Sequence, residues 1–360
     1  MKYESEDLLI QRIARVARTA PGRRPSDWGL ALGMGDDAAI LNSRPNKEWV
    51  VSCDAFIEGI HFLADIHPAD SIGYKALVRA TSDLVAMGAE PRLFLLTLSL
   101  PRKRTGRWLD EFLGGLNRAA RSLSMLLAGG DTTTWASIAV SVTVLGQIDR
   151  LAGLDRSKGE KKRAGNAYAG QALSRSGARP GDRIYVSGRL GTAQLGLELV
   201  RKGYCQPGNL APILQPHLYP RLRVELGRWL AVNRVASAMM DLSDGLSSDL
   251  ARLCRVSRVG AKVWTGRIPT IPDSVRLRLK GLPPGEALLR DRLQMALHGG
   301  DDYELLFTVS KRNERRLRSA PDFSALTGIG EITRDRQILL VHSDGLELPL
   351  KPAGWDPFRT

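Results

Sequence analysis

The chain has 360 residues, 43 % of them hydrophobic, which is enough for two domains with sizeable cores. Its three cysteines are odd in number and far apart, and its five histidines are scattered, which argues against a disulfide framework and against a zinc or transition-metal centre. No continuous apolar span of about 20 residues is present, and the N-terminal stretch carries no apolar signal-peptide core. We therefore expect a cytoplasmic protein without a membrane segment.

A formal net charge of +14 would attract anions such as nucleotides, phosphorylated metabolites or nucleic acid. Part of the excess lies in two stretches, 156–165 and 311–318, which read as a flexible loop and a solvated helix face. Nucleic-acid modules usually add aromatic stacking residues to a basic surface, and the sequence has no such arrangement. We expect no nucleic-acid partner, and a basic nucleic-acid-binding protein is the alternative from a different class of function.

The first part of the chain mixes helical and strand-like segments. Helical periodicity is present at about 5–18, 71–87 and 107–126. Apolar runs predict strands in EWVVSCD, LFLLTLSL and SIAVSVTVLG, with Pro101 and Gly146 as stops. These segments predict an N-terminal domain over residues 1–146.

The composition changes after this domain. Residues 147–180 are rich in Gly, Lys and Arg without a sustained apolar period, so we expect a connection with a basic insert at about 150–172. The pattern then predicts strands in RIYVSG, ASAMMD, AKVWT, YELLFTV and QILLVH, and helices at 191–202, 219–231, 244–257 and about 285–297. These elements predict a C-terminal α/β domain over residues 181–360, in a mixed α/β protein of two domains.

Seven aspartates stand in short Gly- or Ser-rich contexts: Asp36, Asp37, Asp54, Asp83, Asp131, Asp241 and Asp244. Each one alone is an ordinary turn or N-cap residue. Several of them, however, end apolar runs or open helices, where functional groups of α/β proteins collect. Carboxylates brought together repel one another unless cations neutralise them, and their hard oxygen atoms suit Mg²⁺ bound with a phosphate ligand. The joint pattern therefore indicates chemistry on phosphates.

Two familiar phosphate motifs do not explain the aspartates. A Walker loop requires the dipeptide Gly-Lys, which occurs nowhere in the chain. The stretch Gly33-x-Gly35-x-x-Ala38 imitates a dinucleotide fingerprint, but it precedes a strand-like AAIL where the fingerprint needs a helix. Asp36 and Asp37 would also repel a pyrophosphate without a metal. P-loop chemistry is excluded, and a Rossmann site is disfavoured.

Two other segments suit phosphate and metal, and each has a purely structural alternative. In LAGGDTTT the glycines let a backbone approach a phosphate and Asp131 can hold a metal, or the segment is a hairpin or loop turn. In MDLSDGLSSDL, Asp241 ends a strand, while Ser243 and Asp244 stand at a helix start whose free N–H groups favour anions. Its alternative is an N-cap with Asp244 in the first turn.

Seven segments in a fixed order carry a resemblance: GDDAA, CDAFIEGIHF, SDLVAMGAEP, AGGDTT, SGARPGDRIYVSGRLG, DLSDGLSSDL and GGDDYELLFT. Together they resemble the thiamine-monophosphate kinase family, within the superfamily of aminoimidazole-ribonucleotide synthetase-like ATP-binding proteins. The terminal GWDPF is similar to the ending of that family. The resemblance covers nearly the whole chain except the basic insert. It implies a homodimer whose N-terminal sheets join into a barrel, with each active site between the N- and C-terminal domains.

The resemblance also implies an activity and its residues. ATP and several Mg²⁺ ions would be bound, and the γ-phosphoryl group would pass directly, in line, to thiamine monophosphate without a general base, because the acceptor phosphate is already ionised. The implied metal ligands are Asp37, Ser52, Cys53 (through its backbone), Asp54, Asp83, Asp131, Asp241 and Asp244. The implied nucleotide contacts are Gly130, Asp131, Arg175 and Ser243, and the implied thiamine contacts are His61, Asp301 and Trp355.

Three positions depart from the family pattern. Asp301 stands where the family usually has Glu, so its carboxylate is one methylene nearer the backbone. Cys53 stands where Thr is common, and Leu113 where relatives often carry a nucleotide-contacting Tyr, so we leave Leu113 out of the site. The nearest alternative function is another ATP-dependent synthetase of the superfamily, acting on a ribonucleotide or selenide.

Overall fold

The structure is a computed structural model that describes residues 12–13, 30–32, 40–41, 47–149, 172–204, 210–279 and 289–358. The chain divides into two compact units. The first unit consists of Met1–Leu84 and Ala89–Arg150, and the second of Val85–Gly88 and Leu151–Thr360.

A four-stranded sheet forms the centre of the first unit. Its order is β3 (Lys47–Ile57), β6 (Ala139–Asp149), β4 (Glu90–Leu100) and β5 (Leu126–Thr134). Neighbouring strands are antiparallel except β4 and β5, which are parallel. A separate two-stranded sheet joins β1 (Leu30–Leu32) and β2 (Ile40–Leu41).

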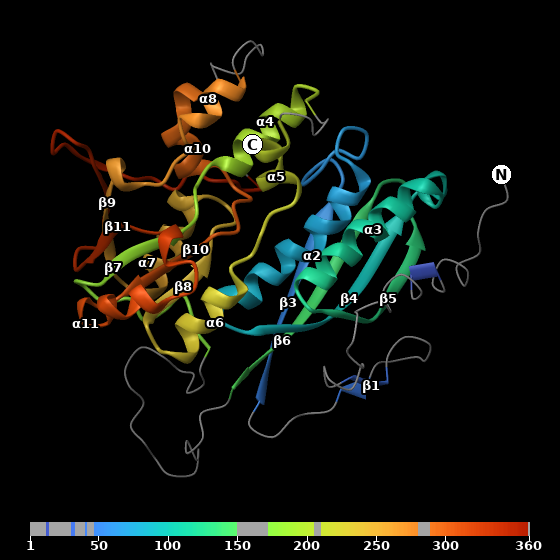
Figure 1. The fold of residues 1–360 in the computed structure, drawn as a ribbon, viewed down its shortest axis with the longest axis horizontal. Helices are drawn as coiled ribbons and strands as arrows, with labels where there is room; N and C mark the ends of the chain where they lie inside the picture. The colour runs from blue at the N-terminus through green and yellow to red at the C-terminus, as the bar shows by residue number, and fades with distance from the viewer. Residues whose placement is uncertain are drawn as a thin grey trace. The chain divides into compact units, whose positions relative to one another are not determined.

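Helices α2 (Ala69–Ala86) and α3 (Arg107–Ser122) lie over one face of this sheet (Figure 1). The two helices approach closely because glycines face the contact. A Cβ added at Gly73 would lie 1.9 Å from the carbonyl oxygen of Phe112, and one at Gly115 would lie 1.7 Å from that of Asp70. On the strands, side chains alternate between this helix-covered face and an open face. In β3, Phe56 is buried under the helices, whereas Val51, Cys53 and Ala55 are exposed.

A seven-stranded sheet forms the centre of the second unit. Its order is β13 (Glu347–Pro349), β12 (Ile338–Val341), β9 (Gly260–Trp264), β11 (Leu326–Thr333), β7 (Arg183–Ser187), β10 (Leu305–Val309) and β8 (Ala236–Asp241). All neighbours are antiparallel except β12 and β9. Strand β10 is apolar except for Thr308 and is buried along its whole length, as expected for a strand covered on both faces.

The helices of the second unit surround this sheet (Figure 1). They are α4 (Thr192–Arg201), α5 (Ala211–Leu218), α6 (Val224–Val232), α7 (Leu246–Ser257), α8 (Ser274–Leu279), α10 (Arg292–His298) and α11 (Lys311–Glu314). Helix α7 packs its apolar residues, including Leu250 and Leu253, into the core beside β8 and β9. Among the described helices, none combines the length and the apolar character needed to cross a membrane.

The structure corrects several sequence predictions. Gly146 does not end its strand, because β6 continues to Asp149 as the antiparallel partner of β3. LAGGDTTT is neither a hairpin turn nor a loop but strand β5, paired along β4. Strands β11 and β13 and helix α5 were not predicted. The expected helix at 5–18 and the basic insert at 150–172 lie almost entirely outside the described residues.

Candidate functional site

Strand β3 and helix α2 hold one set of candidate ligands on the helix-covered face of the first unit. The Ser52 hydroxyl donates a hydrogen bond to the Asp83 carboxylate at 2.6 Å. Asp54, two residues along the same face of β3, accepts a hydrogen bond from Arg79 Nε at 3.1 Å. Arg79 lies one helical turn before Asp83 and also stacks over the Phe56 ring, 5.2 Å from its centroid. The carboxylates of Asp54 and Asp83 are thus presented from neighbouring elements, each fixed by a polar neighbour.

The Cys53 side chain points away from this set. Its Sγ lies 3.4 Å from Ser141 Oγ and accepts a hydrogen bond from Thr143 Oγ1 at 3.4 Å, both on the adjacent strand β6. Cys53 is exposed on the open face. A role through its backbone is therefore compatible with the geometry, whereas its thiol faces the other side of the sheet from Asp54.

Asp131 also lies on the open face. It is in register with Thr97 of β4, which pairs with Ser141 of β6, which in turn pairs with Ala55 of β3. Asp54 belongs to the adjacent row, with the buried Val142 and Leu96. Since adjacent rows of a sheet point to opposite faces, Asp54 and Asp131 of one chain face opposite sides. The sequence prediction names both residues as metal ligands. Within one chain, the sheet presents their side chains on opposite faces.

Gly130 allows strand β5 to approach β4 at this point. A Cβ at Gly130 would lie 1.9 Å from the carbonyl oxygen of Leu96. The Asp131 carboxylate accepts a hydrogen bond from the backbone N–H of Thr132 at 2.9 Å. The glycine is therefore required by strand packing, and its neighbour presents an exposed carboxylate.

His61 follows β3 in a turn. Its Nδ1 accepts a hydrogen bond from the backbone N–H of Ile57 at 3.0 Å, and its ring centroid lies 5.7 Å from that of Phe56. The neutral ring consequently carries its proton on Nε2. This orientation makes Nε2 the donor that His61 can offer to a ligand.

In the second unit, the end of β8 and the segment after it carry Asp241, Ser243 and Asp244. Asp241 ends β8 and is buried, 3 % exposed. Helix α7 begins at Leu246 with Gly245 as its N-cap, so Ser243 and Asp244 precede the helix and do not form its first turn as predicted. Gly245 has φ +104, and a Cβ there would lie 2.9 Å from the carbonyl oxygen of Gly299. The glycine thus brings the segment of Asp244 against the segment that leads to Asp301.

Asp249 on α7 completes an acidic group with Asp241 and Asp244. It is fully buried, and its carboxylate accepts the backbone N–H of Asp244 at 3.0 Å and Arg252 Nη1 at 2.7 Å. Burial, with added repulsion from Asp241 and Asp244, raises the pKa of Asp249 to about 7. These carboxylates therefore carry more negative charge than Arg252 neutralises.

Asp301 lies in a loop with unusual backbone geometry. Asp301 has φ +70 and Tyr303 has φ +50, both left-handed values that non-glycine residues seldom adopt. The Asp301 carboxylate accepts a hydrogen bond from the Tyr303 hydroxyl at 2.8 Å, and His217 Nδ1 lies 3.8 Å away from it. The backbone N–H of Asp301 donates to the carbonyl of Ser243 at 2.8 Å. Asp301 is thus placed beside the segment that carries Asp244.

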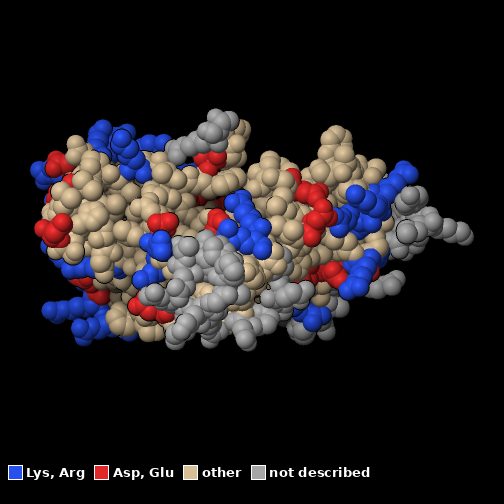
Figure 2. Space-filling view, turned by 90° about the horizontal axis from the view of Figure 1, so that it is seen from above, with Lys and Arg blue, Asp and Glu red and all other residues tan. Residues whose placement is uncertain are grey.

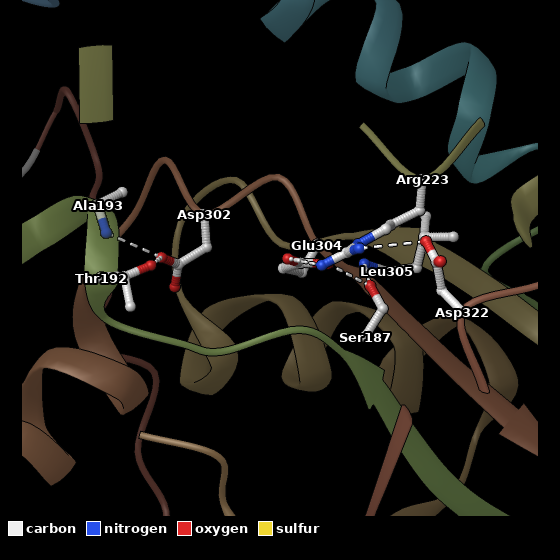
Figure 3. Close-up of polar contacts among 8 residues, drawn as sticks. All are labelled: Ser187, Thr192, Ala193, Arg223, Asp302, Glu304, Leu305 and Asp322. Carbon is white, nitrogen blue, oxygen red and sulfur yellow. Dashed lines mark hydrogen bonds and ion pairs between the residues drawn. The ribbon is translucent and has the colours of Figure 1, made fainter. Parts of the chain in front are cut away.

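Two acidic residues that follow Asp301 in the chain, Asp302 and Glu304, also fix this loop through hydrogen bonds (Figure 3). Asp302 accepts the backbone N–H groups of Gly191 and Ala193, at 2.7 and 3.2 Å, where α4 begins. Asp302 is half-buried, and this burial raises the pKa of its carboxyl group to about 7. Glu304 accepts two hydrogen bonds of 2.9 Å from Arg223 and one of 2.5 Å from the Ser187 hydroxyl. These contacts secure the strained backbone on which Asp301 stands.

Trp355 and Arg175 lie on the surface of the second unit. The backbone N–H of Trp355 donates to the carbonyl of Asp244 at 3.0 Å, and its side chain is 41 % exposed. The carbonyl of Arg175 accepts a hydrogen bond from Ser257 at 3.0 Å, and its side chain is exposed. Both residues are exposed to solvent.

The donor atoms of these residues suit a hard divalent cation. They are carboxylate and hydroxyl oxygens, and the mutual repulsion of Asp241, Asp244 and Asp249 is of the kind that a cation relieves. Within the described ranges, no group of three or more His, Cys, Asp or Glu side chains is by itself arranged to hold a metal ion. Asp36 and Asp37 lie outside the described residues. The fit to Mg²⁺ therefore rests on the chemistry of the donors.

Comparison with known proteins identifies the family. Models for AIR synthase related proteins match residues 35–148 as the N-terminal domain and residues 179–342 as the C-terminal domain. The thiamine-monophosphate kinase of Salmonella typhimurium is 35 % identical over 96 % of this chain and 97 % of its own length. The chain belongs to the thiamine-monophosphate kinase family.

Solved structures of this family share the fold. The thiamine-monophosphate kinase of Stenotrophomonas maltophilia is 33 % identical with a TM-score of 0.72, and the match covers 94 % of this chain and 96 % of that one. A structure described as AaThiL complexed with AMPPCP and TMP is 27 % identical with a TM-score of 0.70, covering 89 % and 91 % of the two chains. The predicted family and the predicted two-domain, mixed α/β AIR synthase-like fold are confirmed.

The structure adds residues that the family motifs did not assign. Arg79 fixes Asp54, and Arg252 contacts both Asp244 and Asp249. Asp249 lies within the motif DLSDGLSSDL, so the sequence could have pointed to it, but its complete burial could not be predicted from the sequence. Leu113 is buried in α3, and its side chain is enclosed by the core.

Proposed function

We propose that this chain catalyses the ATP-dependent phosphorylation of thiamine monophosphate to thiamine diphosphate, in the cytoplasm. The observation that carries the proposal is the near full-length similarity to proteins named thiamine-monophosphate kinase. A relative described as complexed with AMPPCP and TMP supports ATP as the donor and thiamine monophosphate as the acceptor. The oxygen-rich residues of both units supply the groups that such a reaction needs.

The proposed reaction requires neutralisation of negative charge and does not require proton transfer. The acceptor phosphate is ionised at neutral pH, so the main obstacle is repulsion between two polyanions. Bound Mg²⁺ would supply charge neutralisation and align the donor and acceptor oxygens. Asp54 and Asp83 in the first unit and Asp241 and Asp244 in the second would hold it. Asp37, Ser52, Asp131 and the Cys53 backbone are the remaining proposed ligands.

The proposed substrate contacts follow from the chemistry of the side chains. The exposed guanidinium of Arg175 suits a nucleotide phosphate, with Ser243, Gly130 and Asp131 as further contacts. The exposed Trp355 ring suits stacking on the cationic thiazolium or the pyrimidine of thiamine. Asp301 and the Nε2 donor of His61 provide the polar contacts.

We further propose that the open face of the first-unit sheet is covered by a second copy, forming the barrel of a homodimer. Support comes from the exposed Val51, Cys53 and Ala55 on β3, since apolar sheet faces are normally covered. Asp131 shares this face, so in such a dimer it would stand at the interface. Its contact with nucleotide would then involve the copy that covers it.

Nucleic acid is not part of the proposal. On the face drawn in Figure 2, Lys and Arg side chains form separate groups interspersed with Asp and Glu. A nucleic-acid groove would favour a continuous basic track.

The decisive test uses the full chain with ATP, MgCl₂ and thiamine monophosphate. Thiamine diphosphate and ADP should form in equal amounts, measured by chromatography with thiochrome fluorescence for the thiamine product. Asp54→Asn should reduce kcat by about 100-fold or more, because it removes a carboxylate that would hold the Mg²⁺ neutralising the transferred phosphoryl group. Asp65→Asn is the matched control in the same unit, since its side chain is 86 % exposed and contacts only Arg104 in the part of the chain described. No thiamine diphosphate above the Asp54→Asn background would refute the proposal.

A further inference from the structure

Arg252 links two carboxylates of the second unit. It lies on α7, three residues after Asp249, and its Nη1 donates to Asp249 Oδ1 at 2.7 Å. The same Nη1 donates to Asp244 Oδ2. Asp249 in turn accepts the backbone N–H of Asp244 at 3.0 Å. One guanidinium group therefore spans the carboxylate that precedes α7 and the carboxylate buried within its first turns.

The two ends of this bridge differ in burial. Asp249 is 0 % exposed and is fixed inside the helix, whereas the Asp244 side chain is 20 % exposed in a segment outside any helix or strand. The Arg252 side chain is 35 % exposed, so its guanidinium can turn toward water. Arg252 can consequently release Asp244 while it stays attached to Asp249.

Arg252 also offsets the negative charge of neighbouring carboxylates. Asp241, Asp244 and Asp249 lie close enough to repel one another, and uncompensated carboxylates are costly to bury. Among the described residues, Arg252 is the one cation in contact with Asp244 or Asp249. Arg252 therefore offsets part of the negative charge of Asp244 and Asp249.

We infer that Arg252 neutralises Asp244 when no metal is bound and competes with the divalent cation for that carboxylate. This inference rests on the proposed function, which assigns Asp244 to the metal. Metal binding breaks the contact between Arg252 and Asp244, and the contact with Asp249 retains the arginine nearby. Arg252 thereby lowers the metal affinity of the nucleotide-free protein and holds Asp244 in position until the metal arrives.

The experiment measures Mn²⁺ binding to the nucleotide-free full chain, using the EPR signal of free Mn²⁺. Arg252→Gln should bind Mn²⁺ about threefold or more tightly than wild type, because a competing, partly buried ion pair is removed. Arg252→Lys keeps the charge and should remain near wild type. Arg255→Gln is the matched control, an exposed arginine on the same helix, and should change the affinity much less. Thermal unfolding of each variant verifies that it is folded.

A double-mutant cycle identifies the carboxylate involved. Asp244→Asn should weaken Mn²⁺ binding, and in that background Arg252→Gln should no longer tighten it. Suppose that Arg252→Gln binds Mn²⁺ no more tightly than wild type, while Asp244→Asn still weakens binding. This result overturns the competition and leaves the proposed metal role of Asp244 intact. If Asp244→Asn leaves binding unchanged, both the competition and the metal role of Asp244 are overturned. If Arg252→Gln tightens binding equally in both backgrounds, only the competition is overturned, because the effect of Arg252 would then not pass through Asp244.

Discussion

The two units present their carboxylates in different environments. In the first unit, Asp54 and Asp83 are half-buried beside one face of a sheet, where Asp54 contacts Arg79 and Asp83 contacts Ser52. In the second unit, Asp249 and Glu304 are buried and sit in networks of several donors. Buried carboxylates depend on their partners for stability, whereas exposed ones can exchange partners with water at little cost. The second unit therefore couples the integrity of its site to its folding much more strongly.

The largest expected effect comes from removing the cation that neutralises Glu304. Among the described residues, Arg223→Met leaves this buried carboxylate only the Ser187 hydroxyl as a partner, which should lower the free energy of unfolding by about 3 kcal/mol. Asp322→Asn removes a longer contact of 3.3 Å to the same arginine at a half-exposed side chain, and should cost less than about 0.5 kcal/mol. Urea unfolding measures both variants. Equal losses would contradict the contrast between buried and exposed partners.

The same contrast can be tested in the first unit. Asp65 pairs with Arg104 at 2.5 Å, yet its side chain is 86 % exposed. Asp65→Asn should therefore change the free energy of unfolding by less than about 0.5 kcal/mol, despite the short contact. A loss comparable to that of Arg223→Met would show that burial does not separate the two units.

The next effect is a pH dependence caused by Asp302. Burial raises its folded pKa to about 7, whereas an unfolded aspartate titrates near 3.9. Between these values the folded chain keeps a proton that the unfolded chain has released, so the free energy of unfolding falls as pH rises. From pH 5 to 7 this group should remove about 2 to 3 kcal/mol, and above pH 7 little more.

Asp302→Asn cannot titrate at this position. Over the same range, the free energy of unfolding of wild type should therefore fall by that amount relative to the variant. Urea unfolding at several pH values measures it. Asp273→Asn, at a side chain that is 88 % exposed, is the control and should follow the wild-type pH profile. An identical profile for Asp302→Asn and wild type would contradict the raised pKa.

A further effect concerns helix packing in the first unit. Gly115→Ala should destabilise the protein by about 1 to 3 kcal/mol, because its Cβ would collide with the Asp70 carbonyl oxygen of α2. Gly114→Ala, on the same helix with open space around its Cβ, should stabilise it by about 0.5 to 1 kcal/mol. Chemical denaturation compares them. Changes of the same sign would show that the close approach of α2 and α3 is not rigid.

Much of the secondary structure was predictable because its signals are local. The apolar run before Pro101 and the period of α3 depend on neighbours in the chain, and both elements were found in place. Strand β11 was missed, although it lies in the middle of its sheet. Its sequence LTGIGEIT contains Gly330, where a Cβ would lie 2.3 Å from the carbonyl oxygen of Lys262 on β9. The residue that fits the sheet thus weakens the strand pattern in the sequence.

By itself, the sequence determined the family, the two-part α/β organisation and the set of aspartates that point to phosphate chemistry. Ordered motifs are sufficient for this, because each records a local requirement for a turn, a strand end or an acidic ligand. Only the tertiary structure decided that Asp54 and Asp131 face opposite sides of one sheet, and that Arg252 bridges Asp244 and Asp249. Strand register, burial and the direction of side chains depend on residues distant in the chain. For that reason the motifs predict candidate ligands, and the fold decides on which face each of them lies.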